Sequence, residues 1–125
     1  MLHRDYIQDM IDQFCLEVSH PLKQGLTGAD IENCEKIETA IGKMMEMDAK
    51  SALALAPASL VSIMQLTGVS DYLASYIVFG LMRLADMYEK MDNIGLSDIR
   101  RSQAGAIAET YGCDINEIPE EFLDI

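Results

Sequence analysis

Glu17 and His20 are the residues whose types and spacing are most typical of a metal site. They form a Glu-x-x-His motif, which places a carboxylate and an imidazole on one face of a helix. Di-iron bundles use this motif twice and add a glutamate from each of two other helices. Here the motif occurs once, and the only other histidine is His3. We therefore expect no metal and no cofactor, and we interpret His20 as a surface residue at a helix C-terminus, where a cationic imidazole is favoured.

Cys15, Cys34 and Cys113 are the residues that could act as nucleophiles. A catalytic cysteine needs a base such as histidine within hydrogen-bonding reach, and nothing in the sequence requires either histidine to lie near one of them. The sequence contains no CxxC, GxSxG, P-loop, GxGxxG or HExxH motif. We predict that the protein is not an enzyme, and we interpret the cysteines as small buried hydrophobic residues in a reducing compartment.

The balance of charge restricts the partners that the protein can bind. Nine Lys and Arg residues are set against 21 Asp and Glu residues, which gives a net charge of −12 over 125 residues. Cationic side chains bind the phosphates of nucleic acids and anionic membranes, so we expect neither as a partner. No uncharged apolar window reaches the roughly 18 residues that a membrane span needs, and no apolar signal region follows Met1. We therefore expect a cytoplasmic protein.

Residues 102–115 resemble the core of phage-repressor helix-turn-helix proteins, in which Ser/Thr-Gln and a later Ala precede a Gly turn. DNA binding by such a protein needs a recognition helix that meets phosphates with cationic residues. The corresponding segment here, residues 114–122, contains four acids and no Lys or Arg. A helix-turn-helix DNA-binding protein is therefore a minor alternative to an alanine-rich packing helix.

Apolar residues recur at helical spacing along most of the chain, and no segment has the alternating pattern of a strand between hairpin turns. The pattern predicts five helices, over residues 5–19, 27–48, 57–67, 71–92 and 97–111. The signals at their ends are His20-Pro21, a capping box that begins at Thr27, Pro57 with Gly68, Ser70, and Ser97 with Gly112. The acidic tail that follows either packs through Ile115, Ile118, Phe122 and Leu123 or is mobile.

Residues 51–82 contain a single charge, at Asp71. The helix expected over residues 71–92 is apolar almost all round in its first half. This pattern is typical of a helix that is covered by neighbouring helices or by a partner chain. A domain of this size has a limited interior, so we expect a homodimer that buries this surface across a two-fold axis. Tyr76 and Phe79 are the expected anchors, because aromatic residues dominate interface cores.

A long apolar helix and a terminal helix that ends in Tyr111 follow three segments: residues 4–11, RDYIQDMI, residues 40–48, AIGKMMEMD, and residues 53–60, LALAPASL. In this order the segments resemble an uncharacterised family of small bacterial all-helical proteins with degenerate tetratricopeptide-like helix pairs. The resemblance covers most of residues 4–112 and implies an array of helical hairpins. It implies no activity and no site residues.

Together these observations predict an all-α protein of about five helices, with helical hairpins packed as a small bundle or a short tetratricopeptide-like superhelix. Residues 1–112 are expected to form a single domain, followed by an acidic C-terminal tail over residues 113–125. The predicted function is a non-enzymatic protein-interaction domain, a scaffold or adaptor for a protein or peptide partner. The alternative is a small-molecule-binding or enzymatic helical domain with a pocket lined by Met64, Tyr72 and Tyr76.

Overall fold

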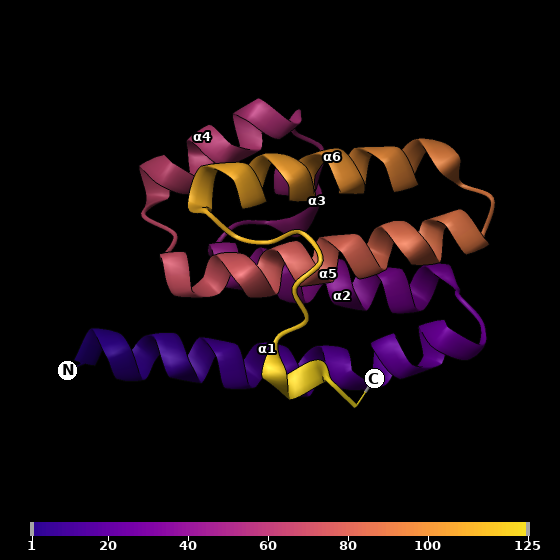
Figure 1. The fold of residues 1–125 in the computed structure, drawn as a ribbon, viewed down its shortest axis with the longest axis horizontal. Coiled ribbons are helices and arrows are strands. Elements are labelled where there is room, and N and C mark those ends of the chain that lie inside the picture. Colours follow the sequence, from indigo (N-terminus) through magenta and orange to yellow (C-terminus); the bar gives the residue numbers. More distant parts are fainter. Residues whose placement is uncertain (1, 125) are drawn as a thin grey trace.

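The chain folds into α-helices joined by short turns (Figure 1). The computed structural model describes residues 2–124, and the side chains of all of them except residues 2–5, 26 and 27. The elements are α1 (Leu2–Thr27), α2 (Ile31–Met45), α3 (Ala49–Leu53), α4 (Pro57–Thr67), α5 (Asp71–Lys90), α6 (Ile94–Tyr111) and the 3-10 turn η1 (Glu120–Phe122). No strand lies within residues 2–124, so the predicted all-α class is confirmed. Six helices replace the five expected, because the segment between α2 and α4 forms the short helix α3.

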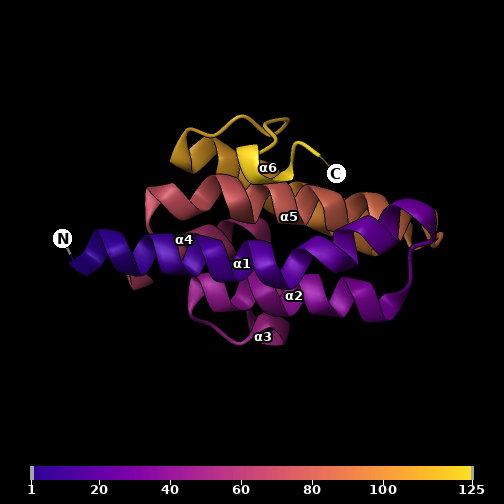
Figure 2. The same ribbon diagram turned by 90° about the horizontal axis from the view of Figure 1, so that it is seen from below.

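Two antiparallel helical hairpins form the body of the protein, as predicted. α1 and α2 make the first hairpin, α5 and α6 make the second, and α5 also contacts α1 and α2 (Figure 1). α3 packs against α2, and α4 packs against α6. Figure 2 shows α3 on one side of α1 and α5 and the C-terminal segment on the opposite side. α5 is therefore the central helix of the fold.

The first helix does not end before Pro21, as its sequence predicts, but continues to Thr27. Proline lacks an N–H and crowds the preceding turn, which kinks a helix when burial holds the chain in place. Pro21 and Leu22 are both buried, and Figure 2 shows that α1 bends in its second half. A Cβ on Gly25 would lie 2.8 Å from Cε of Met87, so the missing side chain lets α1 approach α5 closely. Packing against α5 therefore overrides the local stop signal.

The second helix begins and ends inside its predicted bounds. Asp30, not Thr27, is its N-cap, and the Asp30 carboxylate accepts a hydrogen bond from the backbone N–H of Asn33 at 2.8 Å. The helix ends at Met45 because Glu46 adopts a left-handed conformation with φ 55°. The chain then turns back so sharply that a Cβ on Gly42 would lie 2.9 Å from Cα of Ala49.

The remaining helix ends follow the sequence signals, with one exception. α4 runs from Pro57 and is capped by Gly68, and Ser70 caps α5, as predicted. α6 begins three residues before the predicted cap Ser97, because the side chain of Asn93 accepts a hydrogen bond from the backbone N–H of Leu96 at 3.2 Å. Ser97 is instead buried inside the helix, where its hydroxyl donates to the carbonyl of Ala85 at 2.8 Å.

The apolar half of α5 belongs to the core of the monomer. Phe79 is 3% exposed, and its ring stacks on that of Phe122 with centroids 4.7 Å apart. The expectation that Phe79 anchors a dimer is therefore wrong, since the chain's own C-terminal segment covers it. Tyr76 is partly buried, and its hydroxyl donates to Glu121. The homodimer itself stays a prediction.

Replacing Phe79 by aspartate tests this assignment. We expect Phe79→Asp to lower the free energy of unfolding by at least about 3 kcal/mol, because it deletes a buried ring and buries an unpaired carboxylate. Urea unfolding followed by circular dichroism measures the change. The control is Tyr72→Asp on the same helix, where the side chain is 75% exposed and a change within about 0.5 kcal/mol is expected. A stable Phe79→Asp protein that only loses mass in light scattering would return Phe79 to a dimer interface.

Candidate functional site

Both residues of the Glu-x-x-His motif lie in α1, but the carboxylate of Glu17 is bonded to other side chains. Glu17 accepts hydrogen bonds from Nζ of Lys43 at 2.8 Å and from Nε2 of Gln13 at 3.1 Å, whereas the side chain of His20 is exposed. No group of three or more His, Cys, Asp or Glu residues that could hold a metal ion lies in the described part of the chain. The carboxylate of Glu17 therefore takes part in an ion pair between α1 and α2.

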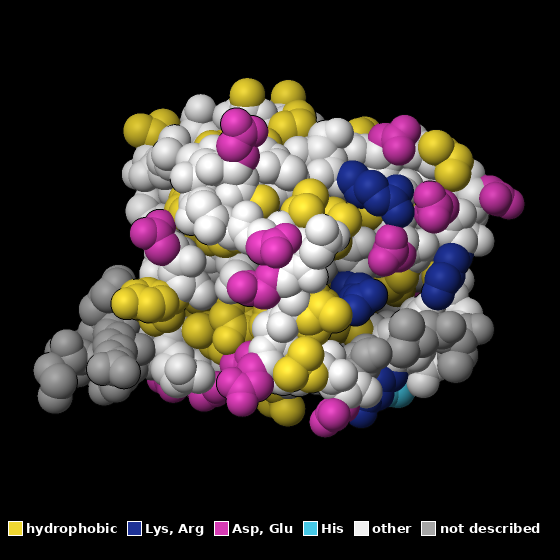
Figure 3. Space-filling model, in the orientation of Figure 1, with side chains coloured by type: hydrophobic (Ala, Val, Ile, Leu, Met, Phe, Trp, Pro, Cys, Tyr) yellow, Lys and Arg dark blue, Asp and Glu magenta, His cyan; other side chains and the backbone are white. Residues whose placement is uncertain are grey.

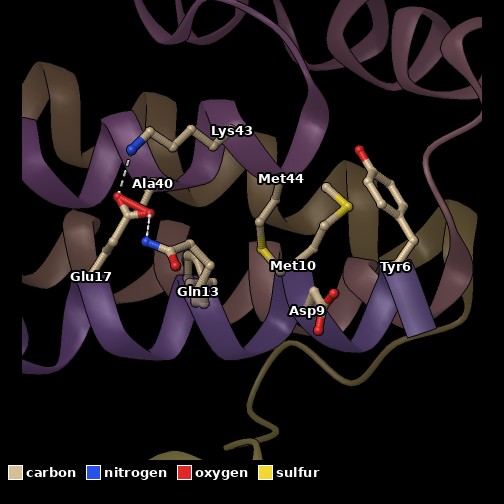
Figure 4. Close-up of a pocket in the computed structure, with 9 residues that line it drawn as sticks. Tyr6, Asp9, Met10, Gln13, Glu17, Ala40, Lys43 and Met44 are labelled. Carbon is tan, nitrogen blue, oxygen red and sulfur yellow. Dashed lines mark hydrogen bonds and ion pairs between the residues drawn. The ribbon is translucent and has the colours of Figure 1, made fainter. Parts of the chain in front are cut away.

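A groove between α1 and α2 surrounds this ion pair. It encloses about 330 Å³, and its lining residues are Tyr6, Asp9, Met10, Gln13, Phe14, Glu17, Ala40, Lys43 and Met44. Figure 4 shows the side chains of Met10 and Met44 in its middle, with Glu17 and Lys43 at one end and Tyr6 at the other. At that second end the hydroxyl of Tyr6 donates to Glu46. Both polar ends are therefore occupied by contacts within the protein, and the groove is mainly an apolar seam between two helices.

The cysteines are poor nucleophiles in this fold. Burial raises the pKa of the Cys34 thiol to about 12, and the nearby charge of Glu38 adds to the effect. Partial burial and the charge of Glu121 raise the pKa of the Cys15 thiol to about 11. The reactive species of a cysteine is the thiolate, and at neutral pH it is scarce at both positions.

The alternative pocket expected from the sequence does not form from its three residues. Met64 is fully buried in α4, the side chain of Tyr72 is mostly exposed, and Tyr76 donates to Glu121. None of the three residues lines the groove between α1 and α2, the cavity around Phe79 and Arg83, or either of the two cavities beside Glu35.

Residues 102–124 do not form the helix-turn-helix motif that the minor alternative requires. α6 ends at Gly112, whose φ of 73° reverses the chain. Residues 113–119 have no regular structure apart from a turn at residues 115–116, and within the described residues only the three-residue turn η1 follows them. No recognition helix is therefore present after the glycine.

A second groove lies between α2 and α6, and we name it the α2–α6 groove. It encloses about 450 Å³, and its lining residues are Ile31, Glu35, Glu38, Thr39, Ala49, Lys50, Leu53, Ala54, Tyr88, Leu96, Ile99 and Arg100. Its rim is apolar and accessible, since Ile31 is 54% exposed and Ile99 is 45% exposed. Its base holds a buried charge, because Arg100 is only 6% exposed.

Three donors converge on one oxygen of Glu38 at this base. Oε2 accepts hydrogen bonds from Nη2 of Arg100 at 2.8 Å, from Nε of Arg100 at 3.2 Å and from the hydroxyl of Tyr88 at 2.8 Å. Among the described residues no hydrogen bond ends on the other oxygen, Oε1. The carboxylate is therefore fixed in position while one of its oxygens keeps its capacity to accept.

The same network holds the chain between α3 and α4 against α6. Nη1 of Arg100 donates to the carbonyl of Leu53 and to Oε1 of Gln103, both at 3.0 Å. Nε2 of Gln103 donates to the carbonyls of Leu53 and Leu55, also at 3.0 Å. These bonds satisfy carbonyls at the end of a short helix, which would otherwise lie unpaired beside the core.

Sequence reasoning did not find this network. The signal for Arg100 was available, because it lies four and seven residues before Ala104 and Ile107 and so continues the apolar stripe of the last helix. A cation in line with such a stripe indicates a buried partner. No pattern indicates that the partner is Glu38, which is 62 residues away.

Comparisons of the chain with models of protein families, with curated proteins and with solved structures gave no match. Within the described residues, no helix has the length and apolar character that crossing a membrane requires.

Removing the charge of Glu38 tests whether the buried ion pair supports the fold. We expect Glu38→Gln to lower the free energy of unfolding by about 3 kcal/mol, because the Arg100 guanidinium is left buried without a counter-charge. Glu17→Gln is the matched control, since Lys43 is largely exposed and such pairs contribute less than about 1 kcal/mol. Urea unfolding measures both changes. Equal changes in the free energy of unfolding for the two variants would show that the buried Glu38–Arg100 pair stabilises the fold no more than the exposed Glu17–Lys43 pair does.

The raised pKa of the Tyr88 phenol predicts that the protein loses stability at alkaline pH. Burial and the hydrogen bond to Glu38 hold the pKa of Tyr88 well above its ordinary value of 10. The folded state therefore favours the neutral phenol, and this stabilisation is complete below pH 10 and is lost as the pH rises above it. Tyr88→Phe should cost about 1.5–3 kcal/mol at pH 7 through the lost bond to a carboxylate, and its stability should fall less steeply above pH 10. Parallel pH profiles of unfolding for the two proteins would refute the assignment.

Proposed function

We propose that the protein is a non-enzymatic protein-interaction module, a scaffold or adaptor, whose α2–α6 groove binds a cationic, apolar segment of a partner protein. The observation that carries the proposal is the carboxylate of Glu38. It lies at the base of an accessible groove, is fixed through Oε2, and keeps Oε1 without a donor from the described residues. A donor group on a partner segment supplies what Oε1 lacks.

The rim of the groove supports the apolar part of the partner. Ile31 at the start of α2 and Ile99 on α6 stand on opposite sides and expose large hydrophobic surfaces, with Leu96 beside them. Two apolar side chains of a helical or extended segment can bury these surfaces while a Lys or Arg between them reaches Glu38.

Charge supports the cationic part of the partner. The protein carries a net charge of −12, which attracts a basic segment over long range. Glu35 also lines the groove, whereas Arg100 is neutralised by Glu38. Lys50 is the remaining cation in the lining and offsets the charge of Glu35, so the preference for a basic partner comes from the net charge of the whole protein.

The chemistry of the groove favours binding over catalysis. Tyr88 and Arg100 are both engaged with Glu38, and neither the thiol of Cys34 nor that of Cys15 ionises readily near pH 7. We further propose a cytoplasmic location and a tetratricopeptide-like character for the two helical hairpins. Light scattering, which separates a mass of 13.9 kDa from its double, tests the predicted homodimer.

A pair of synthetic peptides tests the proposed partner chemistry. Both are amphipathic with Leu and Ile at helical spacing, and their polar positions carry Lys in one and Glu in the other. We expect only the Lys peptide to bind, with amide chemical-shift changes around Glu38 and Ile99 and with an affinity that falls as salt is added. Ile99→Asn should weaken binding by about tenfold, which corresponds to the loss of one apolar contact of 1.4 kcal/mol.

Leu66→Asn is the matched control for this experiment. Leu66 is 85% exposed on α4 and does not line the groove, so its loss should leave the affinity unchanged. Binding of the Lys peptide that is insensitive to Ile99→Asn would reveal attraction to the acidic surface in general and would refute the groove as the site.

A further inference from the structure

The C-terminal segment, residues 113–124, crosses α5 and ends against α1, and we name it the strap (Figure 1). Its backbone hydrogen bonds beyond Cys113 are local, such as Glu117 N–H to the Asp114 carbonyl at 3.1 Å and Phe122 N–H to the Pro119 carbonyl at 2.9 Å. Among the described residues, the hydrogen bond that ties this part of the strap to a helix comes from the hydroxyl of Tyr76. The strap is therefore attached to the bundle mainly by side chains.

Phe122 is the anchor of the strap. Its side chain is 1% exposed and lies between α1 and α5, stacked on Phe79 and edge-on to Phe14 at a centroid distance of 6.1 Å. We name the slot formed by these rings, together with Tyr76, the α1–α5 groove. The ring of Phe122 fills this groove as a ligand would.

The groove also recognises the residue that precedes the aromatic ring. The hydroxyl of Tyr76 donates to both oxygens of Glu121, at 3.0 Å and 2.8 Å. Arg83 stands at the edge, with its guanidinium 5.1 Å from the centroid of Phe79, and its ion pair with Asp86 is long at 4.0 Å. Arg83 also lines a cavity of about 160 Å³, together with Glu117 of the strap. The α1–α5 groove therefore contacts two consecutive residues of the strap, the carboxylate of Glu121 and the ring of Phe122.

Two features are expected to weaken the attachment of the strap to the bundle. Ile118 and Leu123, on either side of the anchor, remain 41% and 66% exposed and add little burial. The strap also carries five of the 21 acids of an already acidic protein, so like charges repel it from the bundle. Figure 3, which views the face that the strap crosses, shows acidic side chains lying among the exposed hydrophobic ones there.

We propose that the α1–α5 groove is a docking site for a partner segment in which one glutamate precedes an aromatic anchor and which carries fewer acids than the strap, and that the strap is its intramolecular occupant. The occupant is released when a partner segment with the same Glu-Phe order replaces it. This site is separate from the α2–α6 groove and binds a single carboxylate rather than a cation, through the hydroxyl of Tyr76 at its edge.

The thiol of Cys15 reports whether the strap is seated. Cys15 lies on α1 close enough to Glu121 for that charge to raise its pKa, and it is partly buried. In a Cys113→Ser background it is the reactive cysteine, because Cys34 has no exposed surface. Phe122→Ala should raise the rate of Cys15 labelling under native conditions by about tenfold, through a shift of the local opening equilibrium. Leu123→Ala is the matched control in the same segment and should not change the rate.

Adding the segment back as a separate peptide tests docking itself. A synthetic peptide of residues 113–125, with serine in place of Cys113, should bind the full-length Phe122→Ala protein and return Cys15 labelling towards the wild-type rate. The same peptide with Phe122→Ala should have no effect, and one with Glu121→Gln should bind more weakly. Failure of the unmodified peptide to slow labelling would show that the strap is a permanent part of the core and would overturn the proposal.

Tyr76→Phe keeps the test decisive if Phe122→Ala does not fold. It removes only the hydrogen bond to Glu121 and retains the ring, so circular dichroism should match the wild type. Cys15 labelling should rise by a few-fold and should be slowed by the free peptide at high concentration. Labelling that stays at the wild-type rate in Tyr76→Phe would also overturn the proposal.

Discussion

The carboxylate of Glu38 and the guanidinium of Arg100 join the two helical hairpins at a point where both are shielded from water. Glu38 belongs to the first hairpin and Arg100 to the second, and Tyr88 on the central helix donates to the same carboxylate oxygen. Charges this deep are costly to bury, and the cost is offset only when hydrogen bonds use most of their capacity. The donors of Arg100 are used on Glu38, Gln103 and the carbonyl of Leu53. The relative position of the hairpins therefore depends on one polar contact as well as on apolar packing.

Local signals were sufficient to predict the elements in the middle of the chain. Pro57, Gly68 and Ser70 each fix a helix end through their own backbone or side-chain chemistry, so α4 has the predicted bounds and α5 begins where predicted and ends at Lys90, two residues early. The stop signal at Pro21 did not end α1, because residues that follow the proline are buried and keep the chain helical. Leu22 and the close contact of Gly25 with Met87 depend on α5, which lies far along the sequence.

In the candidate sites, too, the sequence predicted local features but not contacts between residues that are far apart in the chain. The Glu-x-x-His pattern located Glu17 on a helix face but could not show that Lys43 would take its carboxylate. The network around Arg100 and the slot for Phe122 both join segments of distant sequence. The sequence left two possibilities for the acidic tail, packing through Ile115, Ile118, Phe122 and Leu123 or mobility, and it did not show that the ring of Phe122 alone completes the aromatic core.

Pro21 divides α1 into two segments, because it interrupts the backbone hydrogen bonding of this helix. Because Pro21 has no N–H, the carbonyl of Glu17 loses its usual partner one turn later, and the ladder of backbone hydrogen bonds is interrupted while the chain stays helical. Unwinding that starts at one end of α1 therefore meets a natural boundary at this turn. Phe14 and Cys15 lie in the first half, whereas the second half holds the buried Leu22 and Gly25, the glycine that lies against Met87 of α5. One helix thus contributes to two regions of different cooperativity.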